Sequence, residues 1–267
     1  MNHKQIIYNN AVFSYYTSGN GKPVLLMHGF AEDHSIWSHQ IQSLSEKYYV
    51  ITPDLMGTNK STYLEKEKVS IVDYAMAIKE IIIAEQIDKL IMIGHSMGGY
   101  ITLAYYKLYP EDLVAIGLVH STIFADDHLK KEIRSKAIDF IREYGSNAFL
   151  KTSISGLFHD IQKHELDIKH MIQKSDCISE KSLIQYYQAM RERPDQSQLL
   201  SESKIPVMYM AGIHDQAVPF SVSQKQFHVS RISYVKILKK SAHMGMIEET
   251  ENVNRYLSFF IDNQHIK

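Results

Sequence analysis

The stretch Leu90-Ile-Met-Ile-Gly-His-Ser-Met-Gly-Gly-Tyr-Ile101 decides the fold of this chain. Its first four residues form a short apolar run that is typical of a buried β-strand. After Ser96, apolar residues recur at helical spacing until Pro110 ends the pattern. The glycines two positions before and two positions after Ser96 let two backbones pass at a sharp turn. The stretch therefore predicts a strand, a strained turn and a helix, with the Ser96 hydroxyl exposed above a sheet.

A serine hydroxyl is a poor nucleophile at neutral pH unless a base, an acid that orients the base and an oxyanion hole accompany it. Candidates for the acid and the base follow two later apolar runs of strand type, at 206–211 and 234–238. Asp215 comes after the first run and His243 after the second. We expect both side chains to meet Ser96 at the carboxyl edge of one sheet.

An oxyanion hole needs two backbone N–H groups aimed at the developing negative charge. The apolar run at 23–27 leads into His28-Gly29-Phe30, so the first donor is expected to be the N–H of Phe30. The second is expected to be the N–H of Met97, which follows the candidate nucleophile. We expect the side chains of Phe30, Val218 and Met244 to form part of a pocket wall.

With these motifs the chain resembles the α/β-hydrolase superfamily, and within it the small bacterial carboxylesterases with a helical cap. The resemblance extends from His28-Gly29-Phe30 to His243-Met244-Gly245. It implies a mostly parallel eight-stranded sheet with helices on both faces and an all-helical cap inserted after strand 6. It also implies the chain order Ser, Asp, His for a catalytic triad, which Ser96, Asp215 and His243 satisfy. We expect a core domain of residues 1–120 and 204–267 and a cap of residues 121–203.

Two positions bear on this resemblance. Family members commonly carry Asp-x-x-Gly-x-Gly-x-Ser after the fourth strand, whereas this chain reads Asp54-Leu-Met-Gly-Thr-Asn-Lys-Ser61 and lacks the second glycine. We therefore expect that loop to be shaped differently. Some relatives place the acid after the sixth strand, but residues 119–121 read Val-His-Ser and contain no carboxylate. Asp215 remains the better candidate.

The composition agrees with a globular enzyme and excludes other classes. Of 267 residues, 45% are hydrophobic and 22% are charged, which is ordinary for a globular protein. The formal net charge of −1 gives no electrostatic case for binding nucleic acid or an anionic membrane. The first residues lack the apolar stretch of a signal peptide, and the single cysteine, Cys177, cannot form an intrachain disulfide. We expect a cytoplasmic location; nothing in the sequence fixes the oligomeric state.

Outside the cap, strand-type and helix-type segments alternate from residue 23 onward, which predicts a parallel sheet covered on both faces. The expected strands are residues 4–8, 12–16, 23–28, 49–52, 90–93, 114–119, 206–211 and 234–238. The expected helices are residues 35–46, 71–86, 97–109, 220–229 and 250–262.

Between residues 121 and 203 the alternation stops, and every periodic segment is of helical type. One helical stripe contains Leu129, Ile133, Ala137, Phe140 and Tyr144, and a second contains Leu183, Ile184, Tyr187 and Met190. By resemblance this cap walls the substrate pocket and determines specificity. With no low-complexity tract or long linker, the cap is expected to pack on the core.

Several polar residues of the chain are interpreted as structural. The basic cluster Lys130, Lys131, Arg134 and Lys136 is expected to form the solvated side of the first cap helix, although it could attract an anionic substrate. Three cap histidines, at 159, 164 and 170, lack the i, i+4 spacing of a helical zinc site and are expected on a solvated face. His28 is expected to brace the oxyanion loop, and His95 and His214 are interpreted as packing or surface groups. We expect neither a metal ion nor a cofactor.

The predicted function is hydrolysis of a small-molecule carboxylic ester through an acyl-enzyme intermediate. Three alternatives use the same scaffold: a carbon–carbon bond hydrolase or lyase, a cofactor-free perhydrolase, and a non-catalytic ligand receptor. A serine at position 96 argues against dehalogenases and epoxide hydrolases, which use an aspartate nucleophile. Turnover distinguishes an enzyme from a receptor, and the ester preference distinguishes the enzymes.

Overall fold

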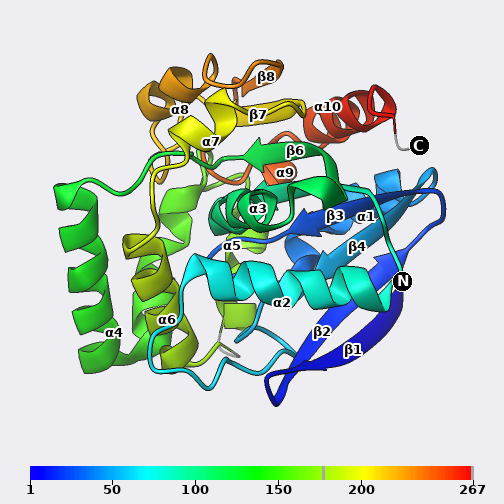
Figure 1. Ribbon diagram of the computed structural model, residues 1–267. Coiled ribbons are helices and arrows are strands. Elements are labelled where there is room, and N and C mark those ends of the chain that lie inside the picture. Colours follow the sequence, from blue (N-terminus) through cyan, green and yellow to red (C-terminus); the bar gives the residue numbers. More distant parts are fainter. Residues whose placement is uncertain (176–177, 266–267) are drawn as a thin grey trace.

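The computed structural model describes residues 1–175 and 178–265. A single central sheet runs through it, with helices packed on each side and a separate group of helices, α4 to α6, beside the sheet (Figure 1). Cys177 lies outside the described residues.

The sheet has eight strands in the order β1-β2-β4-β3-β5-β6-β7-β8. β1 and β2 form an antiparallel hairpin, β2 pairs antiparallel with β4, and every other neighbouring pair is parallel. This confirms the predicted fold class. The strands are β1 (Asn2–Tyr8), β2 (Ala11–Ser18), β3 (Lys22–Met27), β4 (Tyr48–Pro53), β5 (Leu90–His95), β6 (Leu113–Val119), β7 (Val207–Gly212) and β8 (Ser233–Leu238).

The helices of the core cover both faces of the sheet because each presents one apolar side to it. α2 and α3 contribute to one buried hydrophobic cluster, and α1 and α10 contribute to another. The core helices are η1 (His34–Trp37), α1 (Ser38–Leu44), α2 (Ile71–Ala84), α3 (Met97–Leu108), η2 (Pro110–Asp112), α8 (Phe220–Gln226), α9 (Gly245–Glu248) and α10 (Thr250–Asp262). The sequence predicted α2, α3, α8 and α10 to within a few residues, and it merged η1 and α1.

The segment between β6 and β7 is helical, as predicted, and holds no strand among its described residues. Its boundaries as a domain, 121 and 203, stay a prediction. Its elements are α4 (His128–Ser153), η3 (Ser155–Leu157), α5 (Glu165–Ser175), α6 (Glu180–Arg191) and α7 (Ser197–Ser201). α4 bends at Gly145, which has φ 85° and ψ 163°. Only glycine adopts such a conformation at little cost.

The predicted stripe of α4 lies on one side of the helix, but that side faces solvent. Leu129, Ile133 and Tyr144 are 64%, 54% and 58% exposed. The buried side of the same helix carries Arg134, Ile138 and Ile141, because Arg134 pairs with the buried carboxylate of Asp126. The helical period was therefore predictable, whereas the side that packs inward was not.

Within the described part of the chain, no helix combines the length and the apolar character that crossing a lipid bilayer requires.

Candidate functional site

The turn between β5 and α3 has the strained geometry that the sequence predicts. Ser96 has φ 50° and ψ −115°, a conformation that non-glycine residues rarely adopt. A Cβ atom added at Gly94 would lie 2.2 Å from the backbone of Gly98, so a side chain at Gly94 cannot be accommodated. The Ser96 N–H donates to the Val119 carbonyl at 2.9 Å, which anchors the turn to β6.

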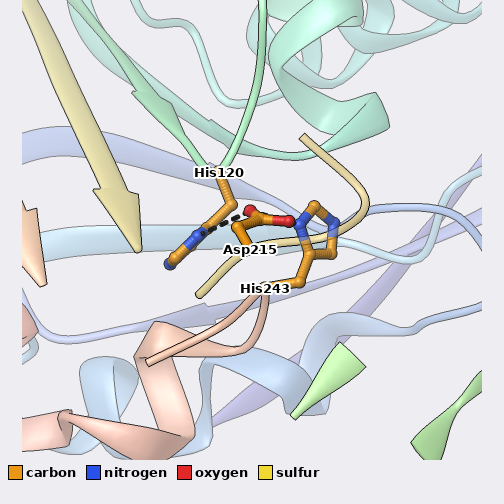
Figure 2. A group of neighbouring side chains, drawn as sticks. All are labelled: His120, Asp215 and His243. Carbon is orange, nitrogen blue, oxygen red and sulfur yellow. Dashed lines mark hydrogen bonds and ion pairs between the residues drawn. The ribbon is translucent and has the colours of Figure 1, made fainter. Parts of the chain in front are cut away.

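Asp215 and His243 are in direct contact at the carboxyl ends of β7 and β8 (Figure 2). The distance from His243 Nδ1 to Asp215 Oδ2 is 2.8 Å, and both residues are 4% exposed. Since a carboxylate oxygen only accepts, Nδ1 carries the proton. This tautomer leaves the Nε2 lone pair free to accept a proton.

Four donors surround the Asp215 carboxylate. Oδ1 accepts from the N–H groups of Ala217 and Val218, each at 2.8 Å, and Oδ2 accepts from His243 and from His120. Burial opposes ionisation, but the charge of His243 and the hydrogen bonds from both imidazoles outweigh it, so the pKa of Asp215 lies well below its usual value. The carboxylate is therefore ionised at every pH at which the protein is expected to work.

Ser96 and His243 line one cavity of about 330 Å³ beneath the cap helices. Among the described residues, no hydrogen bond joins the Ser96 hydroxyl to His243, although both groups line the same cavity. A longer or unaligned contact is common between catalytic groups before substrate binds. The structure thus brings Asp215 to His243 and brings Ser96 to the same cavity.

His120 is a second imidazole on the same carboxylate. Its Nδ1 lies 3.2 Å from Asp215 Oδ2, and its Nε2 accepts the N–H of Gly245 at 3.2 Å. One nitrogen therefore donates and the other accepts, which requires the neutral form. The pKa of His120 is lowered to about 4, because burial, together with the neighbouring imidazoles, outweighs the opposing effect of Asp215.

His95, in contrast, is held in the charged form. Its Nδ1 lies 2.9 Å from Glu32 Oε2, and its Nε2 lies 3.0 Å from the His243 carbonyl oxygen. Both partners are acceptors, so both nitrogens carry protons. Burial lowers the pKa of His95, but Glu32 outweighs it and the net pKa is raised. Burial likewise raises the pKa of Glu32, yet His95 and the Gly29 N–H bring it below its usual value.

Hydrogen bonds of Gly29 and His28 hold the loop after β3 in place. The Gly29 N–H donates to Glu32 Oε2 at 2.6 Å. His28 bridges the loop to the chain after β4, because its Nδ1 contacts the Gly29 carbonyl at 2.8 Å and its Nε2 accepts the Leu55 N–H at 2.8 Å. The N–H of Phe30 donates no hydrogen bond within the described residues.

Met97 is the first residue of α3, so its N–H has no partner inside the helix. An N–H at a helix N-terminus favours a bound anion. That the N–H groups of Phe30 and Met97 together form an oxyanion hole stays a prediction.

The cavity wall combines apolar side chains with a few polar groups. Phe30 and Val218 line it, in keeping with the expected pocket wall. Met244 does not line it, because its fully buried side chain packs into the hydrophobic cluster that contains Trp37. A second cavity of about 350 Å³ between η1 and α5 shares Ala31, Glu32 and Met171 with the first.

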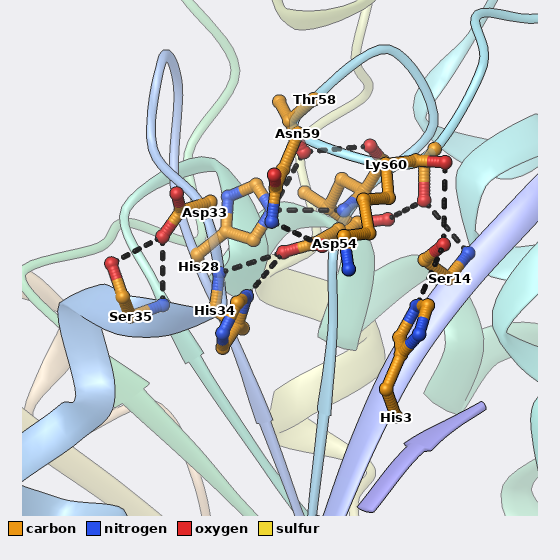
Figure 3. Close-up of polar contacts among 12 residues, drawn as sticks. His3, Ser14, His28, Asp33, His34, Ser35, Asp54, Thr58, Asn59 and Lys60 are labelled. Carbon is orange, nitrogen blue, oxygen red and sulfur yellow. Dashed lines mark hydrogen bonds and ion pairs between the residues drawn. The ribbon is translucent and has the colours of Figure 1, made fainter. Parts of the chain in front are cut away.

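The loop after β4 lacks the second glycine that family members commonly carry. Asn59 occupies the position of that glycine with φ 46°, and asparagine tolerates this left-handed conformation better than most residues. Its side-chain N–H donates to the buried Asp54 carboxylate at 2.9 Å, and His34 Nδ1 contacts the same carboxylate at 2.7 Å (Figure 3). The expectation that this loop differs in shape from that of other family members stays a prediction.

Two groups of side chains bring three potential metal-ligand atoms within 4.8 Å of one another: His120, Asp215 and His243, and Asp33, His34 and Asp54. Hydrogen bonds already account for the donor atoms of the first group, and His34 and Asp54 bond each other in the second. A metal ion would have to displace these bonds. We assign neither group a metal.

The cap is attached directly to the loop that carries His243. The His243 N–H donates to the Leu157 carbonyl at 2.9 Å. The buried carboxylate of Glu248 accepts the N–H of His159 at 2.6 Å and the N–H of Ala242 at 2.8 Å. The cap and the loop that carries His243 are therefore joined by a direct backbone hydrogen bond and through the side chain of Glu248.

The expectations for two polar groups of the cap need correction. Arg134 is buried and lines the cavity, so the basic cluster is not simply the solvated side of α4. His164 is also buried, because its ring stacks on Phe158 and its Nδ1 lies 2.9 Å from Asp167. His159 and His170 are exposed as expected.

His120, Glu32 and Asp126 were not among the candidate site residues, and Arg134 was considered only as part of a basic cluster that could attract an anionic substrate. For His120 a signal existed, since it occupies the position after the sixth strand at which some relatives carry the acid. The pairing of Glu32 with His95 had no signal, because these residues are 63 positions apart and no spacing rule relates them.

Comparison with known proteins places the chain among hydrolases. The model of the alpha/beta hydrolase fold family matches residues 22–250. Lipase 1 of Psychrobacter immobilis is 25% identical over 92% of this chain and 79% of its own. The thermophilic esterase of Thermogutta terrifontis superposes with a TM-score of 0.91 at 22% identity, covering 98% of each chain. The enol-lactonase of Burkholderia xenovorans LB400 gives 0.90 at 16% identity, covering 97% of this chain and all of that one.

Because His120 is neutral in the folded chain, we expect its contribution to the free energy of unfolding to be lost in acid. Its pKa is about 4 in the folded chain against an ordinary 6.5, so the unfolded chain binds the proton first. This contribution is complete above pH 6.5 and is lost as the pH falls towards 4. We expect His120→Asn to flatten the fall in unfolding free energy near pH 5 by about 1 kcal/mol per pH unit.

Urea unfolding of both proteins between pH 7 and 4.5 measures this difference. His128→Asn is a matched control, because the His128 side chain is 90% exposed and should leave the slope unchanged. Equal slopes in the wild type and His120→Asn would contradict a neutral, buried His120.

For the charged pair of Glu32 and His95 we expect the opposite pH dependence, with a contribution to stability that is lost in alkali. Glu32 has a lowered pKa and His95 a raised one, so the pair stabilises fully between their ordinary values of 4.5 and 6.5. Its contribution declines as the pH rises through the raised pKa of His95. Glu32→Gln should cost about 3 kcal/mol or more at pH 5.5, because it leaves a buried charge unpaired, and less at pH 9.

Chemical unfolding of wild type and Glu32→Gln at the two pH values tests this expectation. The exposed Glu46 offers a control, since Glu46→Gln should change the free energy by about 0.5 kcal/mol or less at both. A deficit that is the same at pH 5.5 and pH 9 would indicate lost packing rather than a lost charge pair.

Proposed function

The chain belongs to the alpha/beta hydrolase fold family and is a hydrolase enzyme, so we propose that it cleaves a small-molecule carboxylic ester through a triad of Ser96, His243 and Asp215. One observation carries the proposal. The imidazole of His243, oriented by a 2.8 Å hydrogen bond to Asp215, borders the same cavity as the strained Ser96.

In the first half of the proposed reaction, the Ser96 hydroxyl attacks the ester carbonyl carbon while His243 Nε2 accepts the hydroxyl proton. The carbonyl oxygen becomes an oxyanion that accepts hydrogen bonds from the N–H groups of Phe30 and Met97. The C–O bond then breaks, and His243 donates its proton to the departing alcohol. An acyl group remains bound to Ser96.

In the second half, His243 takes a proton from a water molecule that attacks the acyl-enzyme, and Ser96 leaves with that proton. Asp215 stays ionised throughout, keeps the proton of His243 on Nδ1 and stabilises the imidazolium. Its four hydrogen-bond donors and low pKa support this role.

The relatives support ester cleavage without singling out a substrate. A lipase, an esterase and an enol-lactonase all act on bonds between an acyl carbon and an oxygen, as their names state. Carbon–carbon hydrolysis, lyase and perhydrolase chemistry use the same arrangement of groups and are outcomes that the experiment below distinguishes. We also propose a cytoplasmic location, on the ground that the single cysteine cannot form an intrachain disulfide.

Hydrolysis of p-nitrophenyl esters with acyl chains from two to sixteen carbons, followed by nitrophenolate absorbance, tests the proposal. We expect turnover by the wild type, and a loss of about 10⁶ in kcat for Ser96→Ala, as in comparable triads. Asp215→Asn should lose about 10⁴, because asparagine stabilises the wrong tautomer of His243.

Ser121→Ala is a useful control, because Ser121 donates to the Ser96 carbonyl at 2.7 Å but does not line the cavity. It should retain turnover within about tenfold. Unaltered turnover by Ser96→Ala would reject the nucleophile, and near-normal turnover by Asp215→Asn would reject the acid. Failure on every ester would favour a carbon–carbon hydrolase or lyase, and tight binding without turnover would favour a receptor.

A further inference from the structure

The cationic wall of the catalytic cavity has no role in the proposed mechanism. α4 places Lys130 and Arg134 one helical turn apart, and both line the cavity next to Ile133. Figure 1 shows α4 beside α6, with the sheet and α3 next to them. A buried guanidinium is costly unless its surroundings or a ligand compensate its charge.

The charges around Arg134 do not balance. Asp126 is 2% exposed and pairs with Arg134 through Nε and with Arg193 through Nη1 at 2.8 Å. The Arg134 and Arg193 side chains are themselves 9% and 5% exposed. Two buried guanidinium groups thus share one carboxylate, and the group keeps an excess positive charge.

Arg134 and Lys130 also have N–H groups that donate no hydrogen bond within the described residues. Of its five N–H bonds, Arg134 directs one at Asp126 Oδ2, one at Asp126 Oδ1 over 3.4 Å and one at the Met190 sulfur over 3.4 Å. Within the described residues the other two have no partner. Lys130 Nζ donates to the Ala217 carbonyl at 2.5 Å and has two further N–H bonds.

Among the described residues that line the cavity, Glu32 alone carries a carboxylate, and that carboxylate has other partners. Glu32 faces the cavity but its Oε2 binds His95 and the Gly29 N–H. It therefore does not neutralise the cations of α4. The charge balance of the described wall favours an anionic ligand at the end formed by α4.

The remaining wall indicates the shape of that ligand. Between the oxyanion loop and Arg134 lies Tyr187, whose ring centroid is 4.4 Å from that of Phe30 and 5.7 Å from the Arg134 guanidinium carbon. Apolar side chains of Leu150, Leu157 and Val218 complete the wall. The largely apolar wall between Ser96 and Arg134 favours an aliphatic spacer between an ester at Ser96 and an anion at Arg134.

We propose that the physiological substrate is an ester that carries a carboxylate a few methylene groups from the scissile carbonyl, recognised by Arg134 and Lys130. This inference rests on the proposed ester hydrolysis. A guanidinium matches a carboxylate in geometry and binds it through two parallel hydrogen bonds, whereas Lys130 adds a point charge.

Matched pairs of substrates test the inference. Monoethyl esters of straight-chain dicarboxylic acids of four to eight carbons are compared with the ethyl esters of the corresponding ω-carboxamides, and released ethanol is measured. The carboxamide preserves shape and removes the charge. We expect kcat/KM of the wild type to favour the carboxylate by roughly 10-fold to 100-fold at the best chain length.

Substitutions on α4 identify the cause of that preference. Arg134→Gln should bring the carboxylate-to-carboxamide ratio of kcat/KM close to one. Arg134→Lys should restore part of the ratio, because it keeps the charge but not the fork. Lys130→Gln should lower the ratio partially. Because Lys130 is not part of the ion pair with Asp126, this variant keeps the inference testable even if Arg134→Gln fails to fold.

Binding separates failure of this inference from failure of the proposed function. Calorimetry on Ser96→Ala with monoethyl adipate and with ethyl adipamate gives the same ratio in Kd without requiring turnover. Turnover of carboxamides at least as fast as of carboxylates at every length, or a ratio unchanged in both Arg134→Gln and Lys130→Gln, would overturn the carboxylate site and leave ester hydrolysis standing. No turnover of any ester, with a charge-dependent Kd, would overturn ester hydrolysis and uphold the carboxylate site.

Discussion

A buried ion pair between Glu32 and His95 holds the candidate site together. Glu32 follows β3, His95 ends β5, and the carbonyl that His95 binds belongs to the loop after β8. Because Glu32 also accepts the N–H of Gly29, the oxyanion loop is part of the same arrangement. Three segments that are far apart in the sequence thus meet at two buried, charged side chains.

Three imidazoles lie within 6 Å of one another here, and each has a different set of hydrogen-bond partners. The centroid of His243 is 4.8 Å from that of His95 and 5.7 Å from that of His120. Two acceptors keep His95 charged, whereas one acceptor and one donor keep His120 neutral. His243 has a single acceptor, Asp215, and an unengaged Nε2. All three imidazoles are buried, so the differences between them come from their hydrogen-bond partners and not from burial.

Local patterns were sufficient to predict most of the fold. The succession of strands and helices along the chain follows from alternating apolar runs, and the elbow follows from two glycines placed around Ser96, because these features depend on neighbours in the sequence. Asn59 could also have been interpreted from the sequence, since asparagine is among the few residues that replace glycine at positive φ.

Side-chain partnerships across the fold could not be predicted in this way. Arg134 belongs to a basic cluster that reads as a solvated helix side, and only the buried Asp126 turns it inward. His95 similarly carries no sign in the sequence that a carboxylate 63 positions earlier would hold it charged. Both outcomes depend on which side of an element packs inward, and that is decided by tertiary contacts.

The hydrogen bonds between the cap and the loop of His243 limit how this enzyme can diversify. The Leu157 carbonyl accepts the N–H of His243 directly, and the N–H of His159 is linked to the loop of His243 through Glu248. A cap transplanted from a related protein would have to present the same two backbone groups at the same place. Otherwise the graft would displace the imidazole along with the pocket, and a change of specificity would be accompanied by a loss of turnover.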